Sequence, residues 1–394
     1  MGEGASISRP FPYVVVSMVW LGWVSIIFSR MIIPPLLPLI EEALGISHAQ
    51  GGLLMSSYFL AYAVVQLPAG MLGDRLGVKR MMTLGVLGMS ATSLLLWFAL
   101  SLQHLVALRL LLGLFSGFWY APGVALVTAS ASEGDRGKAL GLTFTASSVS
   151  NLLIFAVVAV LLGRGVDWRS FFLICAAQGF LSTALFFSLL KEADGGRSYA
   201  DAERWRLDAL REVLRVGPIL AVLAFRFVSS LAGGSLFTFL PTYLVLEKGL
   251  TISAASLNLL VYSAAGMFGN VVGGYLTDRL GHRPPLIVST VAVCASVAAL
   301  SHMPPGLPML LLLVSWGALG TFAGAALQVF LARAIPPEVR GTFFGLENGV
   351  GFMGTAVGPV VLGLIADVLG FNAFLQAVLA LFILGLAVAV IAIR

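Results

Sequence analysis

The sequence predicts an all-α membrane protein of twelve transmembrane helices in two related six-helix bundles. The 394 residues are 59% hydrophobic and only 10% charged, whereas an ordinary soluble domain has about 25% charged residues. Apolar runs long enough to cross a bilayer core of about 30 Å recur along the whole chain. Short motifs also recur at one fixed distance, as a duplicated unit would produce.

The expected spans follow the apolar runs in chain order. The first run carries Arg30 and continues through PPLLPLI without a small-residue cleavage site, so we interpret it as a helix and not as a signal peptide. Cys175 and Cys294 lie inside expected spans and are interpreted as core residues. The spans are expected at 12–40, 50–73, 81–101, 104–130, 138–162, 169–190, 217–246, 253–277, 285–303, 308–334, 341–366 and 370–393.

The positions of the basic residues predict the orientation. Lys and Arg in short loops stay on the cytoplasmic side, and most of the 23 Lys and Arg residues fall in inner segments if both termini are cytoplasmic. We therefore expect a multi-pass protein of the cell membrane with both termini in the cytoplasm. The net charge of +5 then reflects topology and gives no basis for nucleic-acid binding.

One fixed offset relates the two halves and indicates a six-helix unit duplicated in parallel orientation. We expect an N-terminal bundle at 1–190, a cytoplasmic linker at 191–216 and a C-terminal bundle at 217–394. The linker sequence YADAERWRLDALREVL indicates either a short amphipathic helix on the inner membrane surface or a simple tether. The offset maps Asp74 onto Asp278, Arg136 onto Arg340, Tyr58 onto Tyr262 and Gln66 onto Asn270.

A charged turn interrupts the apolar sequence twice, as GMLGDRLGVKR from Gly70 and as GGYLTDRLGHR from Gly273. Asp74 ends the expected second helix, where it can accept hydrogen bonds from the N-terminus of a neighbouring helix. Arg75 can pair with acids at other inner helix ends, and such a network would hold the inner side closed until the halves rock. We assign to this gate Asp74, Arg75, Asp278, Arg279, Arg136 and Arg340.

These motifs resemble those of a known family. The turn resembles the G-x-L-a-D-r-x-G-r-k signature of the major facilitator superfamily, which lies between helices 2 and 3 and is repeated between helices 8 and 9. The stretch LVALRLLLGLFSG resembles a second signature of that family, in helix 4. The resemblance covers the whole chain and implies the major facilitator fold, a monomer and a transporter. It leaves the solute open, because this fold serves many unrelated solutes.

Intramembrane polar residues mark the expected substrate site, because they are costly in lipid and usually functional. Arg226 lies within the seventh span, where Ser229 and Ser230 share its face. The spacing from Arg30 to Pro38 resembles helix 1 of the organophosphate exchangers and organic-anion symporters, in which the arginine binds the anionic group. The match is incomplete, since Gly233 stands near the place of the exchangers' second arginine.

Other polar side chains at helical spacing extend the expected substrate site. Each either lines the cavity or forms hydrogen bonds between helices. Arg109, in the second signature, serves either coupling or helix packing. The expected lining residues are Tyr58, Tyr62 and Gln66 in helix 2, Asn258 and Tyr262 in helix 8, and Tyr120 in helix 4.

Glu347 is the one acid well inside an expected helix. It precedes a seam of small residues, Gly351, Gly354 and Gly358, which indicates close helix packing. Glu347 either pairs with a base near the cytoplasmic side, such as Arg333, as part of the inner gate, or carries a proton. The remaining acids of the apolar part and all four histidines fall at helix ends or in loops, including Glu41, His48 and Asp367.

A cavity with up to three arginines and almost no acid favours an anionic substrate, since the guanidinium fork matches carboxylate and phosphate. We expect a secondary active transporter that moves a small carboxylate, sugar acid or organophosphate by alternating access, as an exchanger, uniporter or proton symporter. The alternative is a proton-coupled multidrug exporter, although helix 1 has no acid to attract a cationic drug. No HExxH or GxxxxGK[ST] motif is present, so we expect neither an enzyme nor a cofactor or metal.

Overall fold

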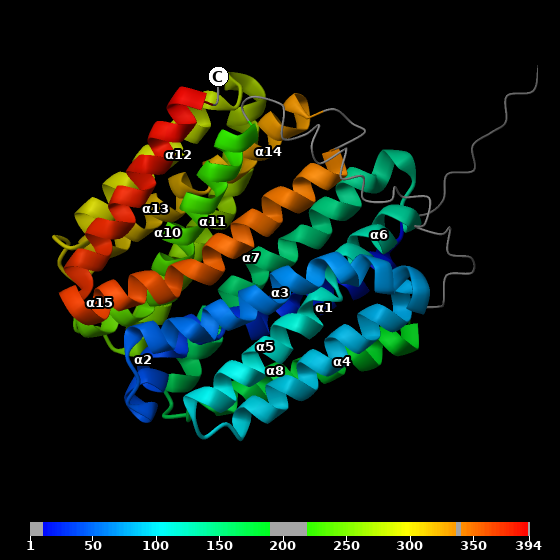
Figure 1. The fold of residues 1–394 in the computed structure, drawn as a ribbon, viewed down its shortest axis with the longest axis horizontal. Helices are drawn as coiled ribbons and strands as arrows, with labels where there is room; N and C mark the ends of the chain where they lie inside the picture. Colours follow the sequence, from blue (N-terminus) through cyan, green and yellow to red (C-terminus); the bar gives the residue numbers. More distant parts are fainter. Residues whose placement is uncertain (1–10, 190–218, 336–339, 393–394) are drawn as a thin grey trace, which may run out of the picture.

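The computed structural model describes residues 11–189, 219–335 and 340–392, and every regular element in these ranges is a helix (Figure 1). The helices before the central gap are α1 (Tyr13–Met31), α2 (Ile33–Leu44), α3 (His48–Leu76), α4 (Val78–Trp97), α5 (Leu102–Gly117), α6 (Tyr120–Ser130), the 3₁₀ helix η1 (Glu133–Asp135), α7 (Arg136–Leu162) and α8 (Ser170–Leu189). Those after it are α10 (Ile219–Leu246), α11 (Ile252–Leu280), α12 (Arg283–Leu300), α13 (Leu307–Gly320), α14 (Phe322–Ala334) and α15 (Arg340–Ala392).

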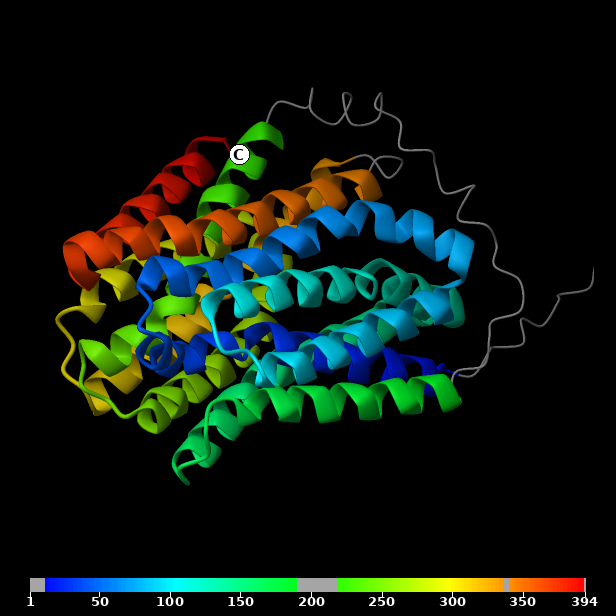
Figure 2. The same cartoon turned by 60° about the horizontal axis from the view of Figure 1, so that its bottom comes forward.

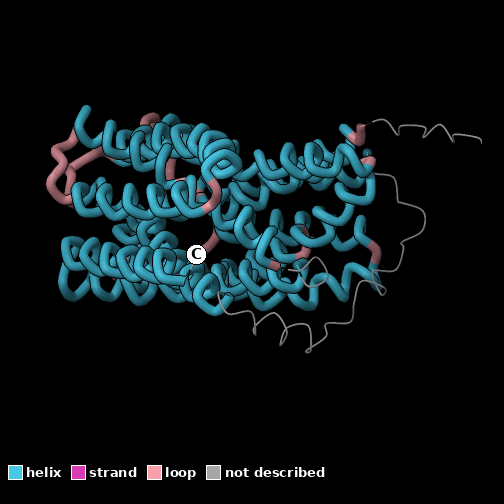
Figure 3. Tube along the Cα trace, turned by 90° about the horizontal axis from the view of Figure 1, so that it is seen from above, coloured by secondary structure: helices cyan, strands magenta, loops and turns pink. Residues whose placement is uncertain are grey.

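The predicted spans coincide with helices, but five of them are divided or joined differently. The first, fourth and tenth predicted spans are each split into two helices, namely α1 and α2, α5 and α6, and α13 and α14. The last two predicted spans run together as α15, which bends at Gly370, where φ is 82°. Within the described ranges, nine helical stretches are long and apolar enough to cross a membrane. Short loops join the helices (Figure 3).

The break between α1 and α2 follows from two prolines. Pro34 and Pro35 occupy the first turn of α2, and proline has no backbone N–H. The carbonyl of Arg30 therefore has no N–H four residues later with which to continue the helix. The chain passes through Ile32 in helical conformation and starts a new helix. This break leaves the carbonyl of Arg30 without a partner in its own helix.

The two groups of helices meet along α3, α7, α11 and α15, which lie between the outer helices in Figure 1. Helix α3 packs against the first half of α15, as Figure 2 shows, and α7 packs against α11. Small residues bring α3 and α15 together at one end. A Cβ atom at Gly52 would clash with the carbonyl oxygen of Pro359, and one at Gly363 would lie 2.9 Å from the carbonyl oxygen of His48. We call this the His48 end; here the two groups are in contact.

The same close helix contact occurs once in each half. A Cβ atom at Gly113 of α5 would clash with the carbonyl oxygen of Tyr58 on α3, and one at Gly317 of α13 would clash with that of Tyr262 on α11. The two pairs are related by the offset that relates Asp74 to Asp278. Equivalent residues therefore make equivalent contacts in the two halves.

Candidate functional site

Arg30 lies in the last turn of α1 and is enclosed by aromatic rings from α3. Its side chain is only 7% exposed, and its Nε donates a hydrogen bond of 3.1 Å to the hydroxyl of Tyr58. The guanidinium carbon lies 4.9 Å from the ring centre of Tyr62 and 5.7 Å from that of Phe59. Phe352 of α15 completes the group, because its ring lies perpendicular to that of Tyr62 at 4.9 Å. We call these five residues the Arg30 box.

The charge of Arg30 has no carboxylate partner among the described residues. Burying an unpaired cation is costly, and here the ring faces and hydroxyls of Tyr58 and Tyr62 provide the compensation. Cation–π contacts contribute about 0.5–2 kcal/mol each, which is less than a buried carboxylate would supply. The Arg30 box therefore carries a positive charge that an incoming anion would neutralise.

The guanidinium of Arg109 binds the backbone around Arg30. Its Nε donates to the carbonyl oxygen of Leu54 at 2.9 Å, and its Nη atoms donate to those of Ser29 and Arg30 at 3.0 and 3.1 Å. The last of these is the carbonyl that Pro34 leaves without a helical partner. Arg109 is fully buried, and it fixes the α1–α2 break onto α3. Of the two roles expected for Arg109, these contacts favour helix packing, and coupling remains a hypothesis.

Arg226 and Glu347 form an ion pair between α10 and α15. The Nε of Arg226 lies 2.8 Å from Oε1 of Glu347. The Glu347 side chain is buried, whereas that of Arg226 is 36% exposed. Gly351 makes room for this arrangement, because a Cβ atom there would lie 2.7 Å from Arg226 Nε. Sequence reasoning named Arg333 as an example of a partner for Glu347; the structure provides Arg226, and the side chain of Arg333 lies outside the described part.

The polar residues expected to share the face of Arg226 do not all converge on it. Ser230 lies against Gly354, and a Cβ atom at Gly385, in the second half of α15, would lie 3.3 Å from Ser229 Oγ. The two serines therefore face different parts of α15. Asn258 is engaged within its own helix, since its Nδ2 donates to the carbonyl oxygen of Ala254 at 2.8 Å.

Tyr262 and its neighbours line a separate pocket of about 190 Å³ between α7 and α11. Tyr262 also packs edge-on against Trp316 at 5.5 Å. Tyr120 packs instead against Trp23 of α1, at 4.9 Å. Gln66 Nε2 is buried without a hydrogen-bond partner in the described chain. Of the expected lining, Tyr58 and Tyr62 thus belong to the Arg30 box and Tyr262 to this second pocket, whereas Gln66, Tyr120 and Asn258 belong to neither. The polar lining residues of the pocket are Ser148, Asn151, Tyr262, Ser263, Asn270 and Thr321.

The gate expected at the other end of α3 remains a prediction. The side chains of Asp74, Arg75 and Arg340 lie outside the described part. Asp278, Arg279 and Arg136 are exposed, and the guanidinium of Arg279 lies 4.6 Å from the ring centre of Tyr275.

A polar contact at the His48 end was not predicted. The carboxylate of Asp367, on α15, accepts hydrogen bonds from the backbone N–H of His48 at 2.7 Å and of Ala49 at 2.9 Å. It thereby caps the N-terminus of α3, where acceptors are favoured. The Nδ1 of His48 lies 2.9 Å from Oε2 of Glu41 on α2. The sequence placed all three side chains at helix ends but gave no signal that they meet.

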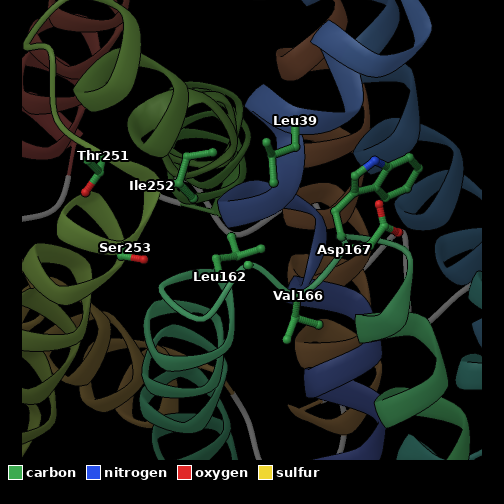
Figure 4. Close-up of a pocket in the computed structure, with 9 residues that line it drawn as sticks. Leu39, Leu162, Val166, Asp167, Thr251, Ile252 and Ser253 are labelled. Atoms are coloured by element: carbon green, nitrogen blue, oxygen red, sulfur yellow. The ribbon is translucent and has the colours of Figure 1, made fainter.

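A larger pocket of about 360 Å³ opens at the His48 end (Figure 4). It is lined by α2, the start of α11 and the segment between α7 and α8, with Leu39, Asp167, Thr251 and Ser253 among its side chains. Neither Arg30 nor the Arg226–Glu347 pair lines it. This pocket is therefore distinct from the buried charged groups.

Comparison with known proteins places this arrangement in a family. The sequence profile of the Major Facilitator Superfamily matches residues 19–359 and, in a second match, 222–394. The chain belongs to this superfamily. Its members are transporters and not enzymes, so this major facilitator protein is a multi-pass transporter of the cell membrane.

Curated relatives of this major facilitator protein are named for different solutes or functions. It is 29% identical over 359 residues to a probable 4-methylmuconolactone transporter of Cupriavidus pinatubonensis, covering 86% of this chain and 81% of the relative. It is 23% identical to a D-galactonate transporter of Escherichia coli, covering 88% and 87%. It is 26% identical to the multidrug resistance protein MdtG of Salmonella paratyphi A, covering 91% and 90%.

A solved structure shares the fold. A bacterial homologue of the human lysosomal transporter Spinster, in an inward-facing and occupied conformation, aligns with a TM-score of 0.78 at 18% identity, over 98% of this chain and 96% of that one.

Proposed function

We propose that this major facilitator protein moves a small organic anion, with Arg30 as the principal binding group. The observation that carries the proposal is the buried guanidinium of Arg30, which has aromatic neighbours and no carboxylate partner among the described residues. Its Nε is held by Tyr58, so the two Nη groups are the donors that a carboxylate or phosphate would take. Guanidinium binds such groups through two parallel hydrogen bonds.

Each half contributes one cation to this proposed site. Arg30 comes from α1 and the partly exposed Arg226 from α10. Phe352 and Glu347 lie about one and a half helical turns apart on α15, and they contact Tyr62 of the Arg30 box and Arg226 respectively. An anion bound between the halves would thus reach both arginines. The relatives named for 4-methylmuconolactone and D-galactonate support a carboxylate or sugar acid; an organophosphate is the third member of the proposed class.

The proposed architecture has twelve spans, with bundles at 1–190 and 217–394 and a cytoplasmic linker at 191–216. Both termini are then cytoplasmic, and the His48 end faces outward, because the basic residues concentrate at the opposite end. In the described structure α3 and α15 are joined at the His48 end. Rocking of the halves would open that end and close the other around the fixed site. The functional unit is proposed to be a monomer.

The alternative is a proton-coupled multidrug exporter, which the relative MdtG supports. A cationic drug needs an accessible acid or an uncharged aromatic surface in its site. In the described site Glu347 is buried and paired with Arg226, and the aromatic rings surround the charge of Arg30. The charge of the site therefore favours the anion.

A thermal-shift screen of the purified protein tests the proposal. The panel contains D-galactonate, 4-methylmuconolactone, glycerol 3-phosphate and cationic dyes, and it is run on the wild type, Arg30→Gln, Arg226→Gln and Arg164→Gln. Arg164 is an exposed loop arginine and serves as the matched control. A ligand at about 100 times its Kd stabilises a protein by about 2.7 kcal/mol.

We expect one anion class to raise the melting temperature of the wild type and of Arg164→Gln, and to leave Arg30→Gln unchanged. Stabilisation by the cationic dyes alone, equal in wild type and Arg30→Gln, would instead contradict the anion proposal and favour the exporter.

A further inference from the structure

We propose that Glu347 is the proton carrier of this transporter and that it takes up one proton when the anion draws Arg226 away from it. This inference rests on the proposed anion transport and adds the coupling ion to it. The anion and Glu347 compete for the same guanidinium, so the chain holds either the ion pair or the bound anion with a protonated Glu347.

The carboxylate of Glu347 depends on a single cation. It is fully buried, and apart from the contact with Arg226 neither of its oxygens has a hydrogen-bond partner among the described residues. The Arg226 contact is short at 2.8 Å, but the N–H is not aligned as a hydrogen bond. Without that cation the ionised carboxylate would lie unpaired in an apolar interior, and such a group binds a proton instead.

Arg226 and Glu347 differ in exposure, and this difference would let Arg226 exchange Glu347 for a substrate anion. The side chain of Arg226 is 36% exposed although its Nε is buried, whereas that of Glu347 is only 1% exposed, so Arg226 is the more accessible partner of the pair. Because Gly351 has no Cβ atom, the guanidinium of Arg226 can lie directly against α15. A substrate carboxylate can therefore pull the guanidinium outward, while Glu347 stays on its buried face of α15.

No other charged group among the described residues faces Glu347. The titratable groups that interact with it are Arg226 of α10 and, across the interface between the halves, Tyr120 of α6. Helices α3 and α12 also pack on α15, but His48 of α3 contacts Asp367 and Arg283 of α12 contacts Val390, both in other parts of α15. Within that part of the chain, Arg226 alone can replace the proton as counterion.

The proposed cycle balances charge. On binding, the ion pair of Arg226 and Glu347 becomes an ion pair of Arg226 with the substrate anion, and one proton from the open aqueous side binds an Oε atom of Glu347. On release, Arg226 returns and the proton leaves to the side to which the anion has gone. One monovalent anion and one proton then cross together, with no net charge moved. The protein is a symporter in this scheme.

The first arm of the test needs no substrate. Arg226→Gln removes the cation, so Glu347 is neutral in the folded variant and the folded state binds one proton more than the unfolded chain. Stability then falls as pH rises. We expect the melting temperature of Arg226→Gln, relative to that of wild type, to fall as the pH rises from about 5 to about 8. The double variant Arg226→Gln with Glu347→Gln should lose this extra pH dependence.

The second arm measures proton uptake in weakly buffered detergent solution on addition of D-galactonate, 4-methylmuconolactone or glycerol 3-phosphate. We expect about one proton per bound anion in wild type and none per bound anion in Glu347→Gln, which keeps the side chain's size; the amount of anion bound is measured for both variants in the same samples. Arg164→Gln serves as control and should match wild type. If Arg226→Gln does not purify as folded protein, this second arm decides the matter alone.

Each failure has its own signature. Binding without proton uptake in wild type, or equal uptake in Glu347→Gln, overturns the role of Glu347 and leaves anion transport standing. If none of the three anions binds, the proposed function fails; the first arm then still decides whether Glu347 takes a proton when Arg226 is removed, and a flat pH profile of Arg226→Gln would reject it.

Discussion

Arg109 and Arg30 are neighbouring buried arginines whose hydrogen-bond partners differ in kind. Arg109 donates to the backbone carbonyls of Leu54, Ser29 and Arg30, the last of which a proline leaves without a helical partner, whereas the Nε of Arg30 donates to the hydroxyl of Tyr58. The same residue type thus serves structure in one place and, in the proposed function, binding in the other. The difference arises from Pro34, which removes the N–H that the carbonyl of Arg30 would otherwise accept.

Arg109→Lys should destabilise the protein without a specific effect on coupling. A lysine ammonium cannot reach three carbonyl oxygens arranged for a guanidinium fork, and breaking a buried charged contact costs about 3–5 kcal/mol. Thermal unfolding measures the loss, with Arg164→Lys as the exposed control. A variant that melts like wild type but uncouples protons from transport would show instead that Arg109 serves coupling.

Tyr58→Phe should weaken anion binding by about tenfold, because hydrogen bonds to charged groups contribute about 1.5–3 kcal/mol. The substitution removes only the hydroxyl that holds the Nε of Arg30. Titration of the anion found in the melting screen measures Kd, with the exposed Tyr13→Phe as control. An unchanged Kd would mean that the aromatic rings alone position Arg30.

Much of this site could be predicted from single residues. A polar group in lipid is costly, so Arg30, Tyr58, Tyr62 and Arg226 were found by polarity alone. Phe59 and Phe352 were missed, because an apolar aromatic residue gives no signal in an apolar sequence. The partner of Glu347 was also missed, since helical spacing gives the face of a residue but not the rotation of the helix opposite.

At the scale of elements, paired glycines determine how closely the helices approach. Gly113→Ala and Gly317→Ala should each destabilise the protein by about 1–3 kcal/mol, because the added Cβ meets the carbonyl of Tyr58 or Tyr262. Gly141→Ala in α7 is the control, since nothing lies within 4 Å of its Cβ position. Similar melting of all three variants would mean that the helices shift freely.

The second prediction at the scale of elements concerns the His48 end. Asp367→Asn keeps the shape of the side chain but removes the charge that caps α3, a loss of about 1 kcal/mol. We expect the two halves to separate there about fivefold more often. A cysteine at Ser47, in a chain without Cys175 and Cys294, should then react faster with a soluble thiol reagent. Glu42→Gln, on the exposed face of α2, should leave the rate unchanged.

The helices themselves were predictable because their apolar lengths match a bilayer, and the duplication was predictable because motifs repeat at one offset. The breaks within spans were not predictable in this way. The sequence predicted single spans where the structure has α1 and α2, α5 and α6, and α13 and α14. Local backbone chemistry, such as the two prolines at the start of α2, decided the first of these. Contacts between helix ends, such as Asp367 with His48, depend on how the two halves dock.

At the scale of the whole molecule, the two halves touch at the His48 end and share one aromatic and charged region at depth. Phe352 links α15 to the Arg30 box, and Glu347 links α15 to Arg226. Movement of α15 relative to α3 would therefore change both arginine environments at once. This is how binding of an anion would bias the opening of the molecule.

The most direct measurement is uptake of radiolabelled anion, chosen by the melting screen, into proteoliposomes that contain the purified protein. Wild type and Arg164→Gln should accumulate the anion when an inward proton gradient is applied, and Arg30→Gln should not rise above empty liposomes. Uptake by Arg30→Gln at the wild-type rate would contradict the account, because the buried guanidinium of Arg30 would then have no part in carrying the substrate.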